Sequence, residues 1–226
     1  MAKASRSREA AVGAGRLNEA AVVEAALALI AERGLEGLSM RALGEKVGVE
    51  AMSLYHWFPA KERLLDAVAD RLLVKVAIPA LPSVATWRAW VIGVARSYRR
   101  VALAHPRAFP LLAARRFLSP GALDFLQANI AAHVAAGFST REALRLTRSL
   151  GGFVNGIVMA EVAPSPFVQA ASLPPIGQVL DERQWSETLE ALRRPALDGA
   201  FEFGLACLLD GALPQRGKPA SRTRHK

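Results

Sequence analysis

Residues 39–58 read SMRALGEKVGVEAMSLYHWF, and this stretch divides at a glycine into two short helical patterns. In the first pattern Leu43 and Val47 are four residues apart, so they lie on one face of a helix. Ser39 precedes the pattern as an N-cap, because its hydroxyl can accept a free backbone N–H. Gly48 follows it, where helix ends favour a left-handed backbone. The sequence therefore predicts a short capped helix that ends in a glycine turn.

A second short helix is expected to follow the turn and to run to about Trp57, with Val49 and Leu54 as apolar anchors. Gly44, in the first helix, has no side chain, so the second helix can cross close over it. A small residue, a turn glycine and a buried aliphatic residue at these spacings are typical of a helix-turn-helix. The second helix of that motif enters the major groove of DNA.

The outer face of this second helix suits contact with DNA. With Val49, Leu54 and Phe58 inward, the residues that point partly outward are Ala51, Met52, Ser53, Tyr55, His56 and Trp57. Small and hydroxylic side chains suit base edges and thymine methyl groups, whereas tyrosine, histidine and the following Lys61 suit phosphate oxygens. The alternative interpretation is that SLYHWF forms the aromatic inner side of a core helix.

Residues 34–73, GLEGLSMRALGEKVGVEAMSLYHWFPAKERLLDAVADRLL, resemble the DNA-binding domain of the tetracycline-repressor (TetR) family. The likeness is strong over residues 17–73. It continues more weakly through Trp87, the pair at 105–106 and the runs AAGFSTREAL and FEFGLACLLDGAL. The resemblance implies a ligand-responsive repressor that binds a palindromic double-stranded DNA operator as a homodimer.

The same resemblance implies which residues contact DNA. Met40 and Arg41 would open the first motif helix beside DNA, with Arg41 on a guanine or a phosphate. The implied base-reading residues are Glu50, Ala51, Met52 and Ser53, and those on the DNA backbone are Tyr55, His56, Trp57 and Lys61. Because Ala51 and Met52 offer no bidentate hydrogen-bonding group, base readout is expected to depend on Arg41, Ser53 and apolar contacts.

The chain of 226 residues is 52% hydrophobic and carries a net charge of +9. Basic residues outnumber acidic ones four to one in residues 1–17, and residues 214–226 hold five basic residues and no acid. Within residues 18–66, by contrast, five basic residues face eight acidic ones. Affinity for DNA is therefore expected from the placement of charges, with two disordered basic tails that add non-specific attraction.

Several features indicate a soluble, cytoplasmic protein that does not enter a membrane. Residues 1–17 lack the apolar core of a secretory signal, and the longest uncharged stretch, 162–180, contains four prolines. The single cysteine, Cys207, excludes an internal disulfide and lies in an apolar helix, which predicts a packed thiol.

The pattern is helical throughout and no strand-like alternation is present, which predicts an all-α fold. An N-terminal three-helix helix-turn-helix domain (18–66) would precede a C-terminal helical ligand-binding and dimerisation domain (67–213), with tails at 1–17 and 214–226. The remaining helices are expected at 18–33, 60–78, 84–104, 107–115, 119–136 and 139–163, then from Asp181 or Ser186, and from Pro195 to Gly211. Residues 164–180 are expected to form a mobile loop.

Two helices are unusually apolar for surface elements. Residues 149–162, SLGGFVNGIVMAEV, place Gly152 and Gly156 one helical turn apart, and FEFGLACLLDGAL ends the last helix. Small residues with wide apolar faces favour burial against a second subunit, in agreement with the four-helix dimer interface that the family resemblance implies. The alternative is an ordinary interior helix within one subunit.

Other chemistries find little support. The sequence has no glycine-rich phosphate loop, no nucleophile elbow and no H-E-x-x-H motif, and the four histidines lack metal-ligand spacing. We therefore expect no catalytic residue, metal or cofactor. The alternatives are an enzyme and a constitutive DNA-binding protein, but a C-terminal region of roughly 140 residues exceeds what dimerisation alone requires.

The resemblance also implies a ligand pocket, formed by Tyr98, Leu112, Arg116, Leu126, Asn129, Thr147 and Asn155. The family's magnesium-binding histidine falls on Leu112, which cannot bind a metal, and its acidic partner falls on Ala160, beside Glu161. The expected effector is therefore uncharged or anionic and largely hydrophobic. Arg116 or Arg115 would take an anionic group, unless both are ordinary surface residues.

Overall fold

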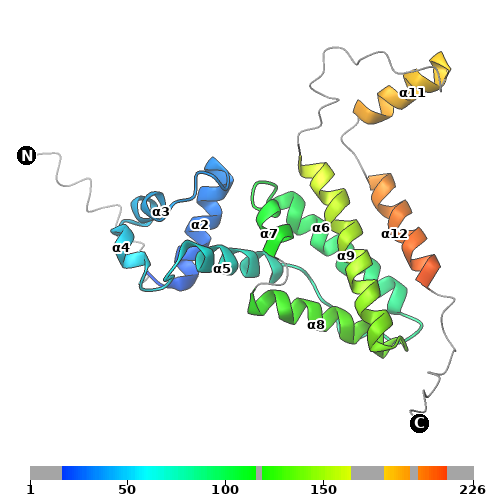
Figure 1. Cartoon of the computed structure of the whole chain (residues 1–226), viewed down its shortest axis with the longest axis horizontal. Helices are drawn as coiled ribbons and strands as arrows, with labels where there is room; N and C mark the ends of the chain where they lie inside the picture. Colours follow the sequence, from blue (N-terminus) through cyan, green and yellow to red (C-terminus); the bar gives the residue numbers. More distant parts are fainter. Residues whose placement is uncertain (1–16, 116–118, 164–180, 194–197, 213–226) are drawn as a thin grey trace, which may run out of the picture.

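The computed structural model describes residues 17–115, 119–163, 181–193 and 198–212, and these contain helices and no strand (Figure 1). The all-α prediction is confirmed. The first four helices are α2 (Glu19–Arg33), α3 (Met40–Val47), α4 (Ala51–Leu54) and α5 (Lys61–Leu73). The others are α6 (Trp87–Ala104), α7 (Phe109–Arg115), α8 (Pro120–Ala135), α9 (Thr140–Val162), α11 (Glu182–Arg193) and α12 (Asp198–Ala212).

Several predictions fall on residues outside the described ranges. They are the tail before residue 17, the loop at 164–180, the start of the last helix at Pro195 and the C-terminal tail. Leu17, which we assigned to the N-terminal tail, packs against the core instead. None of the described helices is long and apolar enough to cross a membrane.

Side-chain caps fix the ends of α2 and α3 as predicted. Asn18 Oδ1 accepts the backbone N–H of Ala21 at 2.9 Å, and Ser39 Oγ accepts that of Ala42 at 3.1 Å. Gly48 closes α3 with a φ of 77°, in the left-handed region that glycine adopts most easily. The start of each helix and the end of α3 are therefore defined by residues that are neighbours in the sequence.

Gly44 sets the distance between α3 and α4. A Cβ atom at this position would lie 2.7 Å from the carbonyl oxygen of Val49 and 3.2 Å from the backbone nitrogen of Ala51. Only glycine permits this approach without moving the backbone. Leu54 and Phe58 are buried beneath the crossing, and Val49 packs against the same core. The predicted helix-turn-helix packing is therefore present.

The α-helical part of the second motif helix is shorter than predicted. It ends at Leu54, and the backbone N–H groups of Tyr55, His56 and Trp57 bond to carbonyls three residues earlier. This tighter turn ends at Trp57, because the N–H of Phe58 bonds to the carbonyl of Leu54, four residues earlier, at 3.0 Å. The aromatic run thus follows α4 as a turn that bends the chain toward α5.

The helix predicted over residues 60–78 ends at Leu73. The backbone N–H of Ala77 donates to Ser97 Oγ on α6 at 2.8 Å, and the side chain of Val76 is buried. The bond to Ser97 ties this segment to α6, so residues 74–78 do not continue as a straight helix. The connecting helix therefore has 13 residues, which corresponds to a length of about 20 Å.

The starts of α8 and α9 agree with the sequence. Ser119 Oγ accepts the backbone N–H of Ala122 at 3.3 Å, with Pro120 in the first turn. Ser139 and Glu142 form the predicted capping box, in which each side chain accepts the other's backbone N–H at 3.3 and 2.9 Å. Of the two predicted starts for α11, Asp181 is the one observed, as its N-cap.

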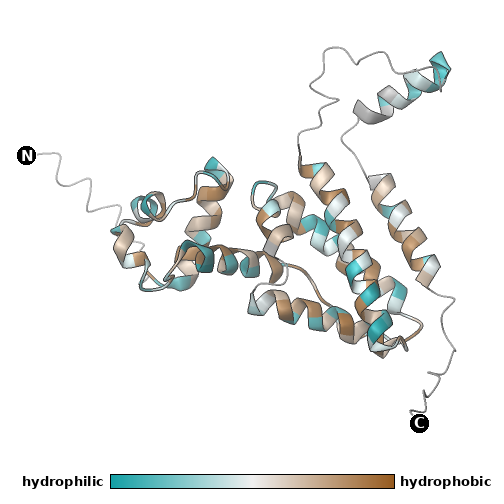
Figure 2. Ribbon diagram, in the orientation of Figure 1, coloured by the Kyte–Doolittle hydropathy of each residue, from teal (hydrophilic) through white to brown (hydrophobic). Residues whose placement is uncertain are grey.

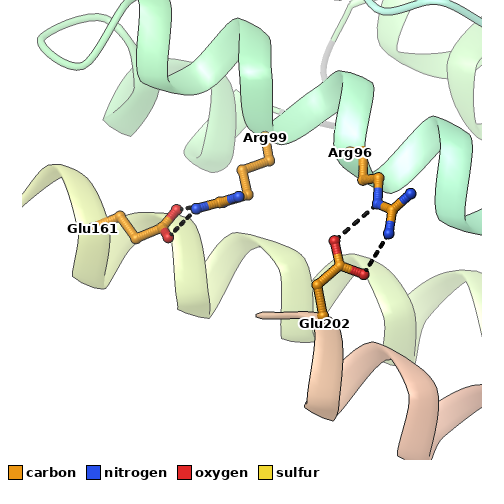
Figure 3. Close-up of polar contacts among 4 residues, drawn as sticks. All are labelled: Arg96, Arg99, Glu161 and Glu202. Carbon is orange, nitrogen blue, oxygen red and sulfur yellow. Dashed lines mark hydrogen bonds and ion pairs between the residues drawn. The ribbon is translucent and has the colours of Figure 1, made fainter. Parts of the chain in front are cut away.

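The longest helices of the C-terminal half are α6, α8 and α9, and α12 lies beside α9 (Figure 1). Figure 2 shows that α8 is predominantly hydrophobic. Two arginines of α6 reach outward to the neighbouring helices (Figure 3). Arg99 binds Glu161 of α9 with a shortest distance of 2.6 Å, and Arg96 binds Glu202 of α12 at 2.8 Å. Arg99 also lies 5.0 Å from the ring centre of Phe201, so it holds α6, α9 and α12 together.

Candidate functional site

The outer surface of α3 and α4 carries most of the residues expected to contact DNA. The exposed ones are Arg41, Glu50, Met52, Ser53, Tyr55 and His56, and the partly buried ones are Ala51, Trp57 and Lys61. Met52 is 74% exposed, which is unusual for a large apolar side chain in a short helix. Trp57 packs against the core, so the alternative of an inward aromatic run applies to Trp57 and Phe58 only.

The two basic residues of α3 differ in their availability. Arg41 Nη1 lies 3.8 Å from Glu45 Oε1, and both side chains are exposed, so this pair contributes little to stability. Lys46 Nζ lies 2.7 Å from Glu32 Oε1 of α2, and its hydrogen bond lowers the pKa of Glu32. Arg41 can therefore exchange its partner for DNA at small cost, whereas Lys46 joins α3 to α2.

Met40 departs from the prediction. Its side chain is only 7% exposed and belongs to the hydrophobic core beside Leu43. The first residue of α3 points inward because the apolar face of this helix begins there. We therefore remove the Met40 side chain from the candidate DNA-contacting set.

A cavity of about 330 Å³ lies among α6, α8 and α9 and is also lined by Leu73 of α5. Its other lining residues are Val91, Val94, Ala95, Tyr98, Phe125, Leu126, Asn129, His133, Thr147, Arg148, Leu150, Gly151, Val154 and Asn155. The wall is mostly apolar, with a few polar side chains. This composition and volume are typical of sites for small organic molecules.

Five of the seven predicted ligand-binding residues line this cavity: Tyr98, Leu126, Asn129, Thr147 and Asn155. Leu112 does not, because its side chain, on α7, is completely buried in the hydrophobic core. Arg116 lies outside the described residues. Among the described residues, Arg148 is the arginine that lines the cavity, and it is exposed on α9.

The polar groups of the cavity are held by bonds to the protein itself. Tyr98 Oη donates to Asn155 Oδ1 at 2.9 Å, and Asn155 Nδ2 donates to the carbonyl of Gly151 at 2.7 Å. Asn129 Nδ2 and Thr147 Oγ1 donate to carbonyls one helical turn earlier, at 2.8 and 2.9 Å. These bonds fix the side chains, so the cavity presents a preformed set of polar atoms.

Sequence reasoning missed His133, Phe125 and Arg148 in this wall. The spacing of the predicted residues that line the cavity contains the signal. Leu126 and Asn129 on α8 are three residues apart, and His133 follows four residues later on the same helix face. Thr147 on α9 is adjacent to Arg148.

The described residues contain no group of three or more His, Cys, Asp or Glu side chains that suits a metal ion. Glu161, which stands next to the position of the family's acidic magnesium partner, forms the bidentate pair with Arg99. Its side chain is almost completely buried there. The carboxylate is therefore occupied as a structural partner of α6.

Comparison with known proteins agrees with this architecture. Residues 22–68 match the family described as "Bacterial regulatory proteins, tetR family", and residues 78–215 match "Tetracyclin repressor-like, C-terminal domain". The class A tetracycline repressor from transposon 1721 of Escherichia coli is 32% identical over 211 residues, 89% of this chain and 93% of that protein. The transcriptional repressor DrrR1 of Streptomyces coeruleorubidus is 29% identical and covers 84% of this chain and 75% of its own length.

Solved structures give the same result. ActR of Streptomyces coelicolor in complex with actinorhodin superposes with a TM-score of 0.71 at 25% identity, over 90% of this chain and 100% of that one. BioQ bound to its double-stranded DNA operator superposes with a TM-score of 0.63 at 25% identity, over 87% and 98%. The chain thus belongs to the TetR family of transcriptional repressors, with an N-terminal helix-turn-helix DNA-binding domain and a C-terminal ligand-binding domain.

Proposed function

We propose that this protein binds a palindromic operator as a homodimer and leaves it when a small, largely hydrophobic effector enters the cavity among α6, α8 and α9. The cavity is the observation that carries the proposal. Its apolar wall favours a molecule that is poorly soluble in water, and its fixed polar atoms give that molecule one orientation. The related ActR binds actinorhodin, which supports a small-molecule effector for this chain.

The DNA-contacting set in this proposal is Arg41, Glu50, Ala51, Met52, Ser53, Tyr55, His56, Trp57 and Lys61. The exposed Met52 supports apolar contact with thymine methyl groups, and the weakly paired Arg41 supports contact with a guanine or a phosphate. BioQ in complex with its operator supports this use of the domain. The protein would meet its operator in the cytoplasm.

A homodimer is supported by the outer faces of α9 and α12. The exposed residues on these faces are Gly152, Gly156 and Met159 of α9, and Ala200, Phe203, Cys207 and Gly211 of α12. They repeat every three or four residues and so form one apolar stripe on each helix. Phe203 is 72% exposed and a Cβ at Gly156 would meet nothing within 4 Å, so a second copy can approach closely. Cys207, predicted to be packed, is exposed in the single chain.

A contact between α5 and α8 supports coupling of the two halves. The carboxylate of Asp70, on α5, accepts hydrogen bonds from Ser119 Oγ and from the backbone N–H of Gly121 at the start of α8. The same helix α8 lines the cavity, and α5 begins at Lys61 beside the DNA-contacting surface. A ligand that displaces α8 would therefore displace α5 and change the separation of the recognition helices in the dimer.

The proposal is tested by selecting operator sequences in vitro and screening small molecules by thermal shift, since a ligand that binds the native state raises its melting temperature. The screen is run on the wild type and on Val154→Trp, which fills the cavity. Arg141→Trp, on an exposed part of α9, is the matched control. We expect hits that stabilise the wild type and the control but not Val154→Trp, and that release operator DNA. Hits that stabilise all three proteins equally would contradict the cavity as the effector site.

A further inference from the structure

His133 holds an unusual position in the cavity wall. It lies in the last turn of α8, is only 1% exposed, and its Nδ1 accepts the indole N–H of Trp87 at 2.8 Å. The rings of Trp87 and Phe138 flank the imidazole, with centroids 5.7 and 6.3 Å away. Two aromatic contacts and one hydrogen bond therefore fix the orientation of this ring.

The bond from Trp87 also fixes the tautomer of His133. Burial lowers the pKa of His133 to about 4, so the ring is neutral at pH 7 and carries a single N–H. Because Nδ1 accepts the indole hydrogen, the ring hydrogen must be on Nε2. The bond from the indole N–H to Nδ1 therefore makes Nε2 the hydrogen-bond donor of the ring.

The Nε2–H has no partner among the described residues. Every fully enclosed side-chain nitrogen and oxygen in that part of the chain does have one, so Nε2 must reach open space. The open space that His133 adjoins is the cavity. The side chains of Tyr98, Asn155 and Thr147 in the same wall donate to protein oxygens. His133 is thus a neutral donor of fixed orientation, and its Nε2–H forms no hydrogen bond with the described residues.

We propose that His133 is the residue that selects the effector, and that the effector is an uncharged, largely apolar molecule with an oxygen that accepts the Nε2–H bond. This inference rests on the proposed ligand-responsive function. A buried donor that meets an apolar group loses its hydrogen bond, so the cavity discriminates against pure hydrocarbons of the same shape. The neutral ring also supplies a donor without a positive charge, which favours a carbonyl or ether oxygen.

Two probes that differ in one atom group test the inference. 2-Acetylnaphthalene carries a carbonyl oxygen, and 2-isopropenylnaphthalene carries a CH₂ group at the same place. Their dissociation constants are measured by titration calorimetry on the wild type and on a Trp87→Phe/His133→Phe double variant. The double change is needed because replacing His133 alone would leave the buried indole N–H of Trp87 without an acceptor.

We expect the wild type to bind the ketone roughly tenfold more tightly than the alkene, and the double variant to bind both alike. Equal affinities in the wild type, a ketone preference that survives in the double variant, or no saturable binding of the ketone would each overturn the inference. A nitrogen-15 spectrum of the wild-type histidine rings provides a second readout that needs no variant. The His133 Nε2–H resonance should shift with the ketone and not with the alkene, and equal shifts would count against the proposal.

Val154→Trp separates this inference from the function on which it rests. If filling the cavity abolishes binding of both probes while the wild type shows no ketone preference, His133 does not select the ligand but the cavity is retained as the site. If Val154→Trp leaves both affinities unchanged, the probes bind elsewhere and the effector cavity itself is wrong.

Discussion

Replacing Gly44 by alanine tests the close crossing of α3 and α4. The new Cβ would lie 2.7 Å from the carbonyl oxygen of Val49, whereas ordinary contact begins at 3.4 Å. The obstructing atom belongs to the backbone and cannot rotate away, so α4 must move outward by roughly 0.7 Å. Overpacking of this kind costs about 1–3 kcal/mol, and the better helix propensity of alanine offsets about 1 kcal/mol. We expect a net loss of about 1 kcal/mol in the free energy of unfolding.

The matched control is Gly93→Ala. Gly93 is an exposed glycine inside α6, and a Cβ there would meet nothing within 4 Å. The same substitution should therefore stabilise the protein by about 0.5–1 kcal/mol. Urea unfolding measures both variants, and fluorescence anisotropy measures their affinity for the selected operator. Gly44→Ala should bind the operator at least tenfold more weakly, because α4 no longer fits the groove, with about 1–3 kcal/mol lost for each base contact. Equal stabilisation by both alanines, with operator affinity retained in Gly44→Ala, would refute this account of the motif.

Four further changes give distinct readouts. Lys61→Ala should weaken binding to all DNA sequences alike and reduce the slope of log K against log salt by about one contact, whereas Arg41→Ala should weaken the operator more than random DNA if it reads a guanine. Equal losses would make Arg41 a phosphate contact. Gly156→Leu should release monomers, as measured by sedimentation, without unfolding the subunit. Alkylation of the single thiol, Cys207, should then be faster than in the wild type. A variant that remains a dimer with an unchanged alkylation rate would place the interface elsewhere. Because the folded pKa of His133 is about 4, below its ordinary value of 6.5, only the unfolded chain binds this proton between those values. The contribution of His133 to the free energy of unfolding should be fully present above pH 6.5. As the pH falls from 6.5 to 4, the free energy of unfolding should decrease by up to about 3 kcal/mol, as measured by urea unfolding. The Trp87→Phe/His133→Phe variant should lack this loss.

The parts of the fold that local chemistry determines were predictable from the sequence. Ser39, Gly48 and the Ser139–Glu142 capping box act through bonds within a few residues, so their roles were visible in the spacing alone. The end of α5 was not, because the helical pattern continues past Leu73. It is stopped by the bond from Ala77 to Ser97, twenty residues away.

The candidate site divides in the same way. Tyr98 and Asn155 were assigned to the cavity through a family resemblance, and they lie there bonded to each other across 57 residues. The spacing from Leu126 and Asn129 places His133 on the same face of α8, but the sequence does not show the bond that fixes its ring, because Trp87 is 46 residues away and only packing brings them together. Met40 was misassigned because the resemblance gave its position in the motif but not the direction of its side chain.

We expect operator and effector to oppose each other through α5 and α8. A closed thermodynamic cycle tests this coupling, with an effector that the thermal-shift screen identifies. The effector is titrated into the protein alone and into the protein saturated with operator, and operator affinity is measured with and without effector. Thermodynamic linkage requires that the operator weakens effector binding by the same factor by which the effector weakens operator binding. A coupling free energy of about 1–3 kcal/mol corresponds to a factor of roughly 5–150. An effector that binds the cavity tightly, yet titrates identically with and without operator, would contradict the account.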